Sequence, residues 1–300
     1  MDKRVVRARY CWGFNMAIGL ILSFRLMAAD GREGKIARDG FDLHYRVYGH
    51  GAPLLILSGG PGFDCDYMEP VARALSSTNA AILVELRGTG RSRPLKIDRE
   101  TVNLKLYLAD LEAVRENLGF DKWTVLGHSA GVILALHYAA AHPRRIAALV
   151  LVDSGPVREA LVAAMGDNIS LHFTPEESEA ARTHPSLQTM LAGYFYDRNK
   201  AKAFIVGFQS NSYHGDTGSM LAADLMAPGM DLRPVLRALD VPALVIAGRQ
   251  DPLDPGMQYE LHLALKNSRI VLLDRCGHFA WLEQPDALYA EIRGFLGSGQ

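Results

Sequence analysis

The sequence has little of what would assign a protein to a special class. It carries no basic stripe, since 32 lysines and arginines are balanced by 33 acidic residues, so nucleic-acid binding is not expected. Its ten histidines are scattered and show neither H-x₃-H nor H-E-x-x-H spacing, so no metal site and no cofactor are predicted. Internal repeats and low-complexity runs are also absent. A hydrophobic share of 49% with interspersed charges indicates a globular protein.

Cysteine is scarce as well, with three residues in the chain of 300. Cys11 lies in an amino-terminal segment with its own character, whereas Cys65 and Cys276 follow apolar, strand-like runs. Whether these two form a disulfide stays open, because pairing depends on a geometry that spacing does not reveal.

The amino terminus has the order of a targeting segment. Basic residues precede an apolar run over residues 10–24, and Met27-Ala28-Ala29 then supplies small residues. This order predicts a secretory signal peptide over residues 1–29 and an exported protein, periplasmic or secreted. Two alternatives remain. The first is an uncleaved membrane anchor, although about 15 apolar residues are short for a membrane span. The second is a start of translation at Met16 or Met27, which would leave the protein in the cytoplasm.

Beyond residue 30, strand-like and helix-like segments alternate. The predicted strands are residues 43–48, 54–58, 81–85, 123–126, 147–152, 242–247 and 269–273, and the predicted helices are residues 66–76, 103–118, 130–142, 256–266 and 285–296. This alternation indicates an α/β fold in which helices cover both faces of a mostly parallel sheet. Ligands then bind at the carboxyl ends of the strands.

The alternation is interrupted in the middle of the chain. Residues 155–234 carry apolar side chains at helical spacing and no strand-like run, which predicts a helical cap inserted into the core. The expected organisation is therefore a core of residues 30–154 and 235–300, a cap of residues 155–234, and the targeting segment 1–29.

One pentapeptide carries the clearest chemical signal. Gly127-His128-Ser129-Ala130-Gly131 fits the pattern G-x-S-x-G and stands between the apolar segment 123–126 and a helix-like run from Val132. In this context the glycines allow a sharp turn from strand to helix, which exposes the serine hydroxyl at the carboxyl end of the strand. Ser129 is therefore the candidate nucleophile.

A serine nucleophile needs a base and an acid that orients that base. Asp251 and His278 each follow an apolar, strand-like segment, so both are expected at the same edge of the sheet as Ser129. The chain order Ser, Asp, His is typical of a triad on an open α/β sheet.

Two other aspartates are alternatives to Asp251 as the acid. Asp153 ends the predicted strand 147–152 and is an alternative to Asp251, although it is otherwise expected to cap the chain as it leaves the sheet. Asp254 is a third candidate.

Acyl transfer also needs N–H donors for the oxygen that becomes negative. The backbone N–H of Ala130, directly after the nucleophile, is one predicted donor. The second is expected from the glycine-rich loop 58–62, where backbone groups can approach a ligand closely. Gly60 is the preferred donor in this loop, and Gly59 is the alternative.

Four further segments can be set beside this elbow. They are Ser58-Gly59-Gly60-Pro61-Gly62, the run from Glu85 to Pro94, Gly248-Arg249-Gln250-Asp251, and Gly277-His278 with Glu283-Gln284-Pro285. Together with the elbow they resemble the α/β-hydrolase family, and within it the prolyl iminopeptidase-type serine peptidases. The resemblance spans residues 36–297 and implies an α/β-hydrolase fold with a Ser-His-Asp triad. It also implies a small ester, amide or short peptide as substrate.

Some residues differ from the iminopeptidase pattern. Ser58 stands where the group has histidine, Glu85 where it has aspartate, and Ala130 where tryptophan is usual. The group also carries a tryptophan-rich cap helix, and residues 155–234 contain no tryptophan.

The cap sequence also differs where an iminopeptidase binds the free amino group of its substrate. A glutamate precedes a Tyr-Phe pair in such caps, whereas Leu191 and no acidic residue precedes Tyr194-Phe195 here. Three other glutamates of the cap could bind the amino group instead, namely Glu176, Glu177 and Glu179. The alternative is that they form the solvated first turn of a helix.

The predicted function is a serine hydrolase that cleaves a small ester or amide through an acyl-enzyme, resembling a prolyl iminopeptidase by motif. A carboxylesterase or lactonase acting on uncharged acyl groups is the alternative. A third possibility, of another class, is a small-molecule receptor with a hydrolase fold and little turnover.

Overall fold

The computed structural model describes residues 31–207 and 212–297. The predicted signal peptide or anchor and Cys11 lie outside these ranges. Within them, no helix has the length and the apolar composition that crossing a membrane would require.

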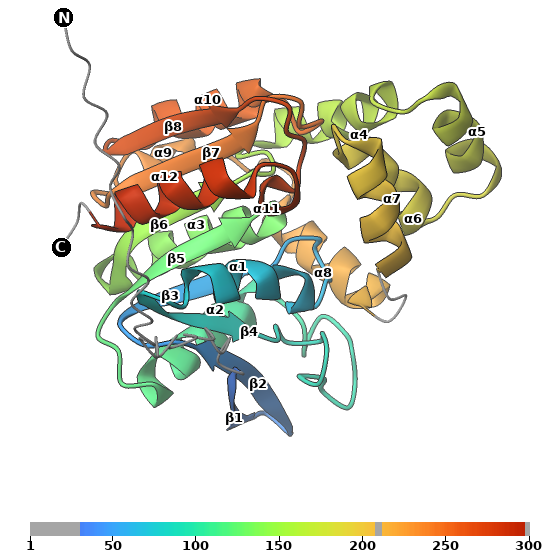
Figure 1. Ribbon diagram of the computed structural model, residues 1–300. Coiled ribbons are helices and arrows are strands. Elements are labelled where there is room, and N and C mark those ends of the chain that lie inside the picture. Colours follow the sequence, from blue (N-terminus) through green and yellow to red (C-terminus); the bar gives the residue numbers. More distant parts are fainter. Residues whose placement is uncertain (1–30, 208–211, 298–300) are drawn as a thin grey trace, which may run out of the picture.

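Eight strands form a single sheet in the order β1-β2-β4-β3-β5-β6-β7-β8 (Figure 1). The strands are β1 Arg32–Arg38, β2 Phe41–Tyr48, β3 Ala52–Leu57, β4 Asn79–Val84, β5 Trp123–His128, β6 Ile146–Val152, β7 Ala243–Gly248 and β8 Ser268–Leu273. The β1–β2 and β2–β4 pairs are antiparallel, and all other neighbours are parallel.

Helices follow most strands of the sheet. They are α1 Glu69–Leu75, α2 Leu104–Asn117, α3 Ala130–Ala141, α9 Arg233–Leu236, α10 Pro255–Ala264, α11 Ala280–Glu283 and α12 Pro285–Gly297. Figure 1 shows α1 and α12 on one face of the sheet and α2, α3 and α10 on the other. Both faces of the central strands are therefore covered, which is why β7, and β4 after Asn79, are apolar throughout and every residue of both strands is buried.

Two apolar clusters fill the space between the sheet and its helices. Leu111 of α2, Ile133 of α3 and Leu261 of α10 belong to one cluster, and Leu75 of α1 and Ile292 of α12 belong to the other. All of these residues are fully buried or nearly so. The predicted layered α/β architecture is confirmed.

The predicted strands are present with small shifts at their ends, but the sequence analysis missed β1. This strand reads Arg-Glu-Gly-Lys-Ile-Ala-Arg and pairs with β2 at the edge of the sheet, from Arg32 opposite Val47 to Arg38 opposite Phe41. An edge strand buries little of its surface, so it needs few apolar residues and leaves no hydrophobic period in the sequence.

The segment between β6 and α9 contains helices and no named strand among its described residues. These helices are α4 Val162–Leu171, α5 Pro175–Thr183, α6 Leu187–Leu191, α7 Arg198–Gly207 and α8 Gly215–Leu225. Figure 1 shows α4 to α7 projecting beyond the carboxyl ends of the strands, with α5 at the outer tip. The segment thus stands over the edge of the sheet at which ligands are expected.

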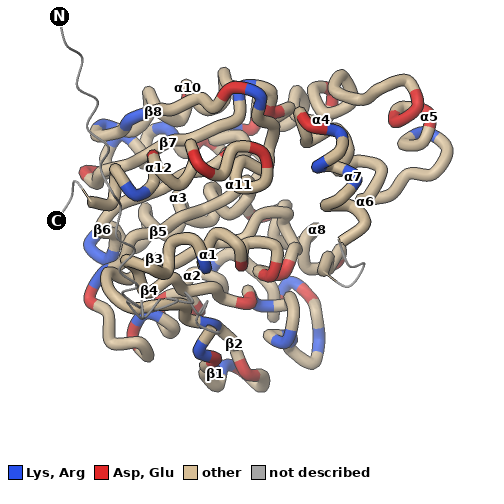
Figure 2. Tube along the Cα trace, viewed as in Figure 1, with Lys and Arg blue, Asp and Glu red and all other residues tan. Residues whose placement is uncertain are grey.

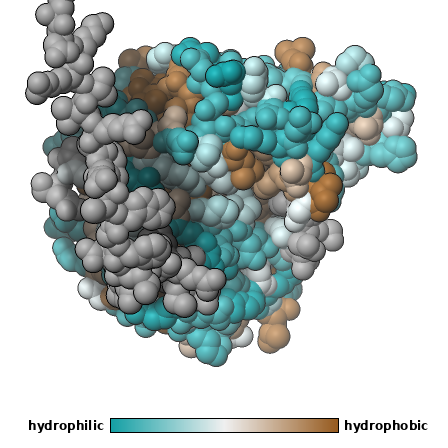
Figure 3. All heavy atoms as spheres, viewed as in Figure 1, coloured by the Kyte–Doolittle hydropathy of each residue, from teal (hydrophilic) through white to brown (hydrophobic). Residues whose placement is uncertain are grey.

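The described surface is mostly hydrophilic on the face shown in Figure 3, where apolar residues form small separate patches. Large apolar side chains that are highly exposed are Leu95, Leu171, Val206 and Leu263. Scattered exposed apolar residues of this kind are normal in globular proteins.

The strand register decides which loops meet. Gly127 of β5 lies beside Leu57 of β3, and Val152 of β6 lies beside Ile246 of β7. The parallel strands β3, β5, β6, β7 and β8 therefore end at one edge of the sheet, and the loops that follow them lie at that edge.

Candidate active site

Ser129 stands at the turn between β5 and α3 with backbone angles φ 56° and ψ −124°. This conformation is unfavourable for a residue with a side chain. The backbone also packs closely on both sides of Ser129, which requires residues without a Cβ at positions 127 and 131. A Cβ on Gly127 would come within 2.6 Å of the Gly131 oxygen, and one on Gly131 within 2.5 Å of the Leu57 oxygen. The G-x-S-x-G spacing is thus a steric requirement of the turn that presents Ser129.

His278 and Asp251 lie together at the ends of the neighbouring strands β8 and β7. Nδ1 of His278 is 2.9 Å from Oδ2 of Asp251, and both side chains are buried. Oδ1 of Asp251 accepts from the backbone N–H of Leu253 at 2.9 Å, which fixes the carboxyl group. A carboxylate at Nδ1 leaves the other ring nitrogen, Nε2, free to act as a base.

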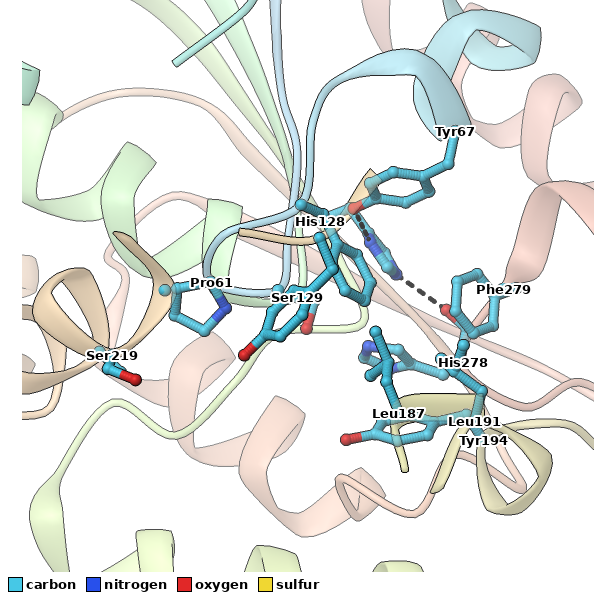
Figure 4. Close-up of a pocket in the computed structure, with 15 residues that line it drawn as sticks. Pro61, Tyr67, His128, Ser129, Leu187, Leu191, Tyr194, Ser219, His278 and Phe279 are labelled. Carbon is cyan, nitrogen blue, oxygen red and sulfur yellow. Dashed lines mark hydrogen bonds between the residues drawn. The ribbon is translucent and has the colours of Figure 1, made fainter. Parts of the chain in front are cut away.

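Ser129 and His278 line one pocket with a volume of about 220 Å³ (Figure 4). Its apolar lining consists of Pro61, Phe63, Leu187, Leu191, Ala222 and Phe279. Its other lining residues are Gly60, Tyr67, His128, Ser129, Tyr194, Tyr213, Gly218, Ser219 and His278. No Asp, Glu, Lys or Arg is among these described lining residues.

The two alternative acids make different contacts from those of Asp251. Asp254 is exposed and caps α10, where its Oδ1 accepts from the N–H of Gly256 at 2.6 Å. Asp153 is fully buried, and its Oδ1 accepts from the N–H of Gly248 on the neighbouring strand β7 at 2.8 Å. Asp153 therefore ties two strand ends together, which corrects the expectation that it caps its own chain segment.

The predicted oxyanion donors occupy different environments. Gly60 lines the pocket beside Ser129, whereas the N–H of Gly59 donates to Oη of Tyr67. Ala130 is the first residue of α3, where backbone N–H groups have no acceptor within the helix. Gly60 and Ala130 therefore remain the predicted donors, and the hydrogen bond of Gly59 argues against the alternative.

Tyr67 and His128 extend this hydrogen bonding into a chain that sequence reasoning missed. Nε2 of His128 is 2.9 Å from the carbonyl oxygen of His278, so it must donate there (Figure 4). Nδ1 of His128 is 2.9 Å from Oη of Tyr67 and must then accept. Burial lowers the pKa of His128 well below its ordinary value, and His278 lowers it further, so His128 is neutral.

This chain connects three separate loops. It runs from the N–H of Gly59 through Tyr67 and His128 to the backbone of His278. His128 could have been noticed from its position inside the G-x-S-x-G motif, but its contact with Tyr67 appears only in the tertiary structure.

Glu283 joins the His278 loop to the cap. Its Oε2 accepts from the N–H of Gly277 at 2.6 Å, and its Oε1 accepts from the N–H of Asp197 at 2.7 Å. The N–H of His278 donates in turn to the carbonyl oxygen of Tyr194 at 2.7 Å. Burial raises the pKa of Glu283, and its backbone donors oppose that shift. The cap backbone is thus part of the support of His278.

The cap glutamates considered for amine recognition lie on α5, at the tip of the cap (Figures 1 and 2). Glu177 completes a capping box with Thr174 and lies 3.4 Å from Arg198, and Glu179 pairs with Arg182. Glu176, Glu177 and Glu179 are not among the described residues that line the pocket, whereas Leu191 is.

Cys65 and Cys276 are both buried free thiols, so the open question of their pairing is answered against a disulfide. Burial raises the pKa of Cys65 to about 12, which leaves it an inert thiol at neutral pH.

Among the described residues, one group is spaced closely enough to bind a metal ion. It consists of Asp153, Asp251 and His278, whose potential ligand atoms lie within 4.8 Å of one another. The 2.9 Å hydrogen bond between Asp251 and His278 already accounts for the contact between two of them. The absence of a metal and of a cofactor stays a prediction.

Comparison with known proteins agrees with this architecture. The family described as the alpha/beta hydrolase fold matches residues 52–285. A probable proline iminopeptidase of Streptomyces coelicolor is 27% identical over 309 residues, which cover 87% of this chain and 94% of that protein. This relative is similar over nearly its whole length.

Solved structures show the same fold. A proline iminopeptidase-related protein from Thermus thermophilus superposes with a TM-score of 0.73 at 21% identity, covering 90% of this chain and 98% of that one. Est816, described as an N-acyl homoserine lactone degrading enzyme, superposes with a TM-score of 0.68 at 21% identity, covering 87% of this chain and all of its own.

Proposed function

The chain belongs to the α/β-hydrolase family, and we propose that it is a serine hydrolase that transfers a small uncharged acyl group from an ester or amide to water. The observation that carries the proposal is the single pocket that Ser129 and His278 share, whose described lining contains no Asp, Glu, Lys or Arg. A site without a fixed charge suits a neutral acyl group, because an unpaired charge is costly to desolvate.

In the proposed reaction, Nε2 of His278 takes the proton of the Ser129 hydroxyl as its oxygen attacks the substrate carbonyl. Asp251 holds the ring through Nδ1 and stabilises the imidazolium that forms. The negative oxygen is held by the N–H groups of Gly60 and Ala130, each worth about 2.7–4 kcal/mol in comparable sites.

The proton on His278 then passes to the leaving alcohol or amine, and an ester to Ser129 remains. Water attacks this acyl-enzyme with His278 again as the base, which releases the carboxylic acid and restores the serine. Each proton taken by His278 is returned within the same half-reaction, so the cycle needs no cofactor.

Prolyl iminopeptidase activity is the second candidate, favoured by the relatives. The protonated amine of such a substrate needs a carboxylate nearby, and the described pocket supplies none. Removal of a proline from a free amino terminus is therefore the less favoured reaction for this pocket.

The test compares three chromogenic substrates: a short-chain p-nitrophenyl ester, proline p-nitroanilide and N-acetylproline p-nitroanilide. We expect kcat/KM, corrected for intrinsic reactivity, to be highest for the ester, and acetylation of the proline nitrogen to leave binding intact. Much faster cleavage of the free prolyl amide, abolished by acetylation, would assign the protein to the iminopeptidases.

The same assay separates an enzyme from a receptor. An enzyme continues past the burst of p-nitrophenol, whereas a receptor that hardly turns over stops after about one equivalent.

A further inference from the structure

Two buried aspartates lie side by side behind His278. Asp153 follows β6 and Asp251 follows β7, so the parallel pairing of these strands brings the carboxyl groups together. Ligand atoms of both, and of His278, lie within 4.8 Å of one another, and all three side chains are buried. Of the two carboxyl groups, the proposed reaction uses that of Asp251 alone and assigns no part to Asp153.

The hydrogen bonds of the two carboxyl groups are unequal. Asp251 has a donor at each oxygen, from His278 Nδ1 and from the N–H of Leu253, both at 2.9 Å. Asp153 has the N–H of Gly248 at Oδ1, while its buried Oδ2 has no donor among the described residues. A buried acceptor without a donor is costly, but a protonated Oδ2 is itself a donor. The negative charge therefore belongs on Asp251 and the proton on Asp153.

The surroundings do not balance two negative charges. The titratable groups that interact with the pair from the other elements are Tyr194, Cys276, His278 and Glu283. None of these described groups is a lysine or arginine; Lys200 interacts with Cys276 and Glu283, and its Nζ donates to the carbonyl oxygens of Leu282 and Glu283. Burial raises the pKa of Asp153 well above its ordinary value, and the charge of Asp251 raises it further. Two adjacent buried carboxyl groups of this kind keep one proton between them.

We propose that Asp153 is a positioning residue, a neutral carboxylic acid whose Oδ2–H donates to the Asp251 carboxylate and so holds Asp251 against His278. This inference rests on the proposed function, because Asp251 must be the acid that orients the base. The proton stays on Asp153 throughout the cycle, and no bond to Asp153 forms or breaks in catalysis.

Two variants test the donor without changing the backbone. Asp153 has φ 50°, in the left-handed region that asparagine tolerates and glycine adopts freely. Asp153→Asn replaces the O–H donor by an N–H donor and keeps an acceptor for the N–H of Gly248, whereas Asp153→Gly removes both the donor and that acceptor. We expect Asp153→Asn to stay within about threefold of the wild-type kcat/KM, and Asp153→Gly to lose about tenfold or more in kcat.

The pH profile distinguishes a neutral Asp153 from a charged one. For a neutral Asp153, the midpoint of the acidic limb of kcat/KM is the same in Asp153→Asn and in the wild type. Were Asp153 charged, its removal would lower that midpoint by about 1–3 units. Such a shift overturns the proposal, and so does full activity in a correctly folded Asp153→Gly variant.

An infrared measurement needs no turnover and therefore stands apart from the proposed function. The wild-type protein at neutral pH should show the carbonyl band of a protonated carboxyl group, sensitive to D₂O and absent from Asp153→Asn. Lack of this band in the wild type overturns the proposal even if the enzyme proves to be an esterase. A band without ester or amide hydrolysis would instead leave the proton assignment standing and refute the proposed function.

Discussion

The two sides of the pocket are held in different ways. The floor, which we define as Ser129, His278, His128 and Tyr67 with Asp251 behind His278, comes from the strand ends and from the turn before α1. Hydrogen bonds link Tyr67, His128, His278 and Asp251. The cap wall, which we define as Leu187, Leu191, Tyr213, Ser219 and Ala222, comes from α6, α8 and the residues before α8 and offers mostly alkyl and ring carbon.

This difference separates reactivity from selectivity. Hydrogen bonds fix distances and protonation states, so a change on the floor should alter the rate with every substrate. Apolar contacts fill space and tolerate variation, so a change in the cap wall should alter which acyl group is preferred. The predictions below test this division.

The largest effect is expected from the nucleophile. Ser129→Ala should lower kcat by about 10⁵-fold or more, and the double variant with His278→Ala should be little worse, because the residues act as a unit. The measurement is ester turnover under saturating substrate. Ser219→Ala, on the cap wall, is the matched control and should remain active. A Ser129→Ala protein of near wild-type activity would rule out the mechanism.

The choice of acid comes second. Asp251→Asn should lower kcat by about 10⁴-fold, since an amide neither fixes the imidazole tautomer nor stabilises imidazolium. Asp254→Asn is the control, because asparagine also caps a helix and Asp254 lies outside the pocket. Steady-state kinetics with circular dichroism separates catalysis from folding. A large loss in Asp254→Asn with little in Asp251→Asn would mean that the wrong acid was chosen.

A smaller effect is expected from the hydrogen-bonded chain. Tyr67→Phe removes the hydroxyl that accepts from Gly59 and donates to His128. We expect the free energy of unfolding to fall by about 1–3 kcal/mol and kcat to fall about tenfold. Tyr213→Phe changes the other side of the pocket in the same way and should leave kcat nearly unchanged. Equal effects of the two variants would erase the distinction between floor and cap wall.

The cap wall should control preference rather than rate. Leu191→Glu places a carboxylate where the pocket is apolar, and should shift the ratio of kcat/KM for proline p-nitroanilide to that for the ester by about tenfold towards the amide. Leu191→Gln has the same length without the charge and should not produce this shift. A ratio that moves equally in both variants would indicate a size effect.

The smallest effect concerns Asp64, whose backbone N–H donates to the carbonyl oxygen of Ser212 at 3.0 Å and so joins its loop to the cap. Burial raises the pKa of Asp64 from 3.8 to about 6, so ionisation disfavours the folded state. Stability is therefore lost as the pH rises through about 4 to 6, and Asp64→Asn should unfold at higher temperature than the wild type at about pH 7.5. The difference should vanish near pH 4. Equal differences at both pH values would contradict the assignment.

The sequence predicted what depends on local order along the chain. The elbow at Ser129 needs only a strand, two glycines and a helix, and Asp251 and His278 follow apolar segments that were recognisable as strands. The edge strand β1 was missed because its polar sequence buries little. The environment of Asp153 was misjudged, since the donor to its carboxyl group, Gly248, is 95 residues away in the chain.

Contacts of Tyr67 and Glu283 were beyond sequence reasoning for the same reason. Glu283 was part of a recognised motif, but its partner Asp197 lies in the cap, 86 residues earlier. Local patterns therefore identify the reacting groups, whereas the groups that hold them in place emerge only when distant loops meet.

The carboxylate of Glu283 has a consequence for protein engineering. Exchanging caps between relatives is an attractive way to change selectivity, and the chain between β6 and α9 looks like a natural module for such grafts. The backbone of Tyr194 and Asp197 nevertheless supports the loop of His278, so this short stretch belongs to the scaffold. A chimera that keeps residues 194–197 of the recipient and replaces the cap on either side preserves these contacts. Replacing the whole cap would also replace the backbone that positions the loop of His278.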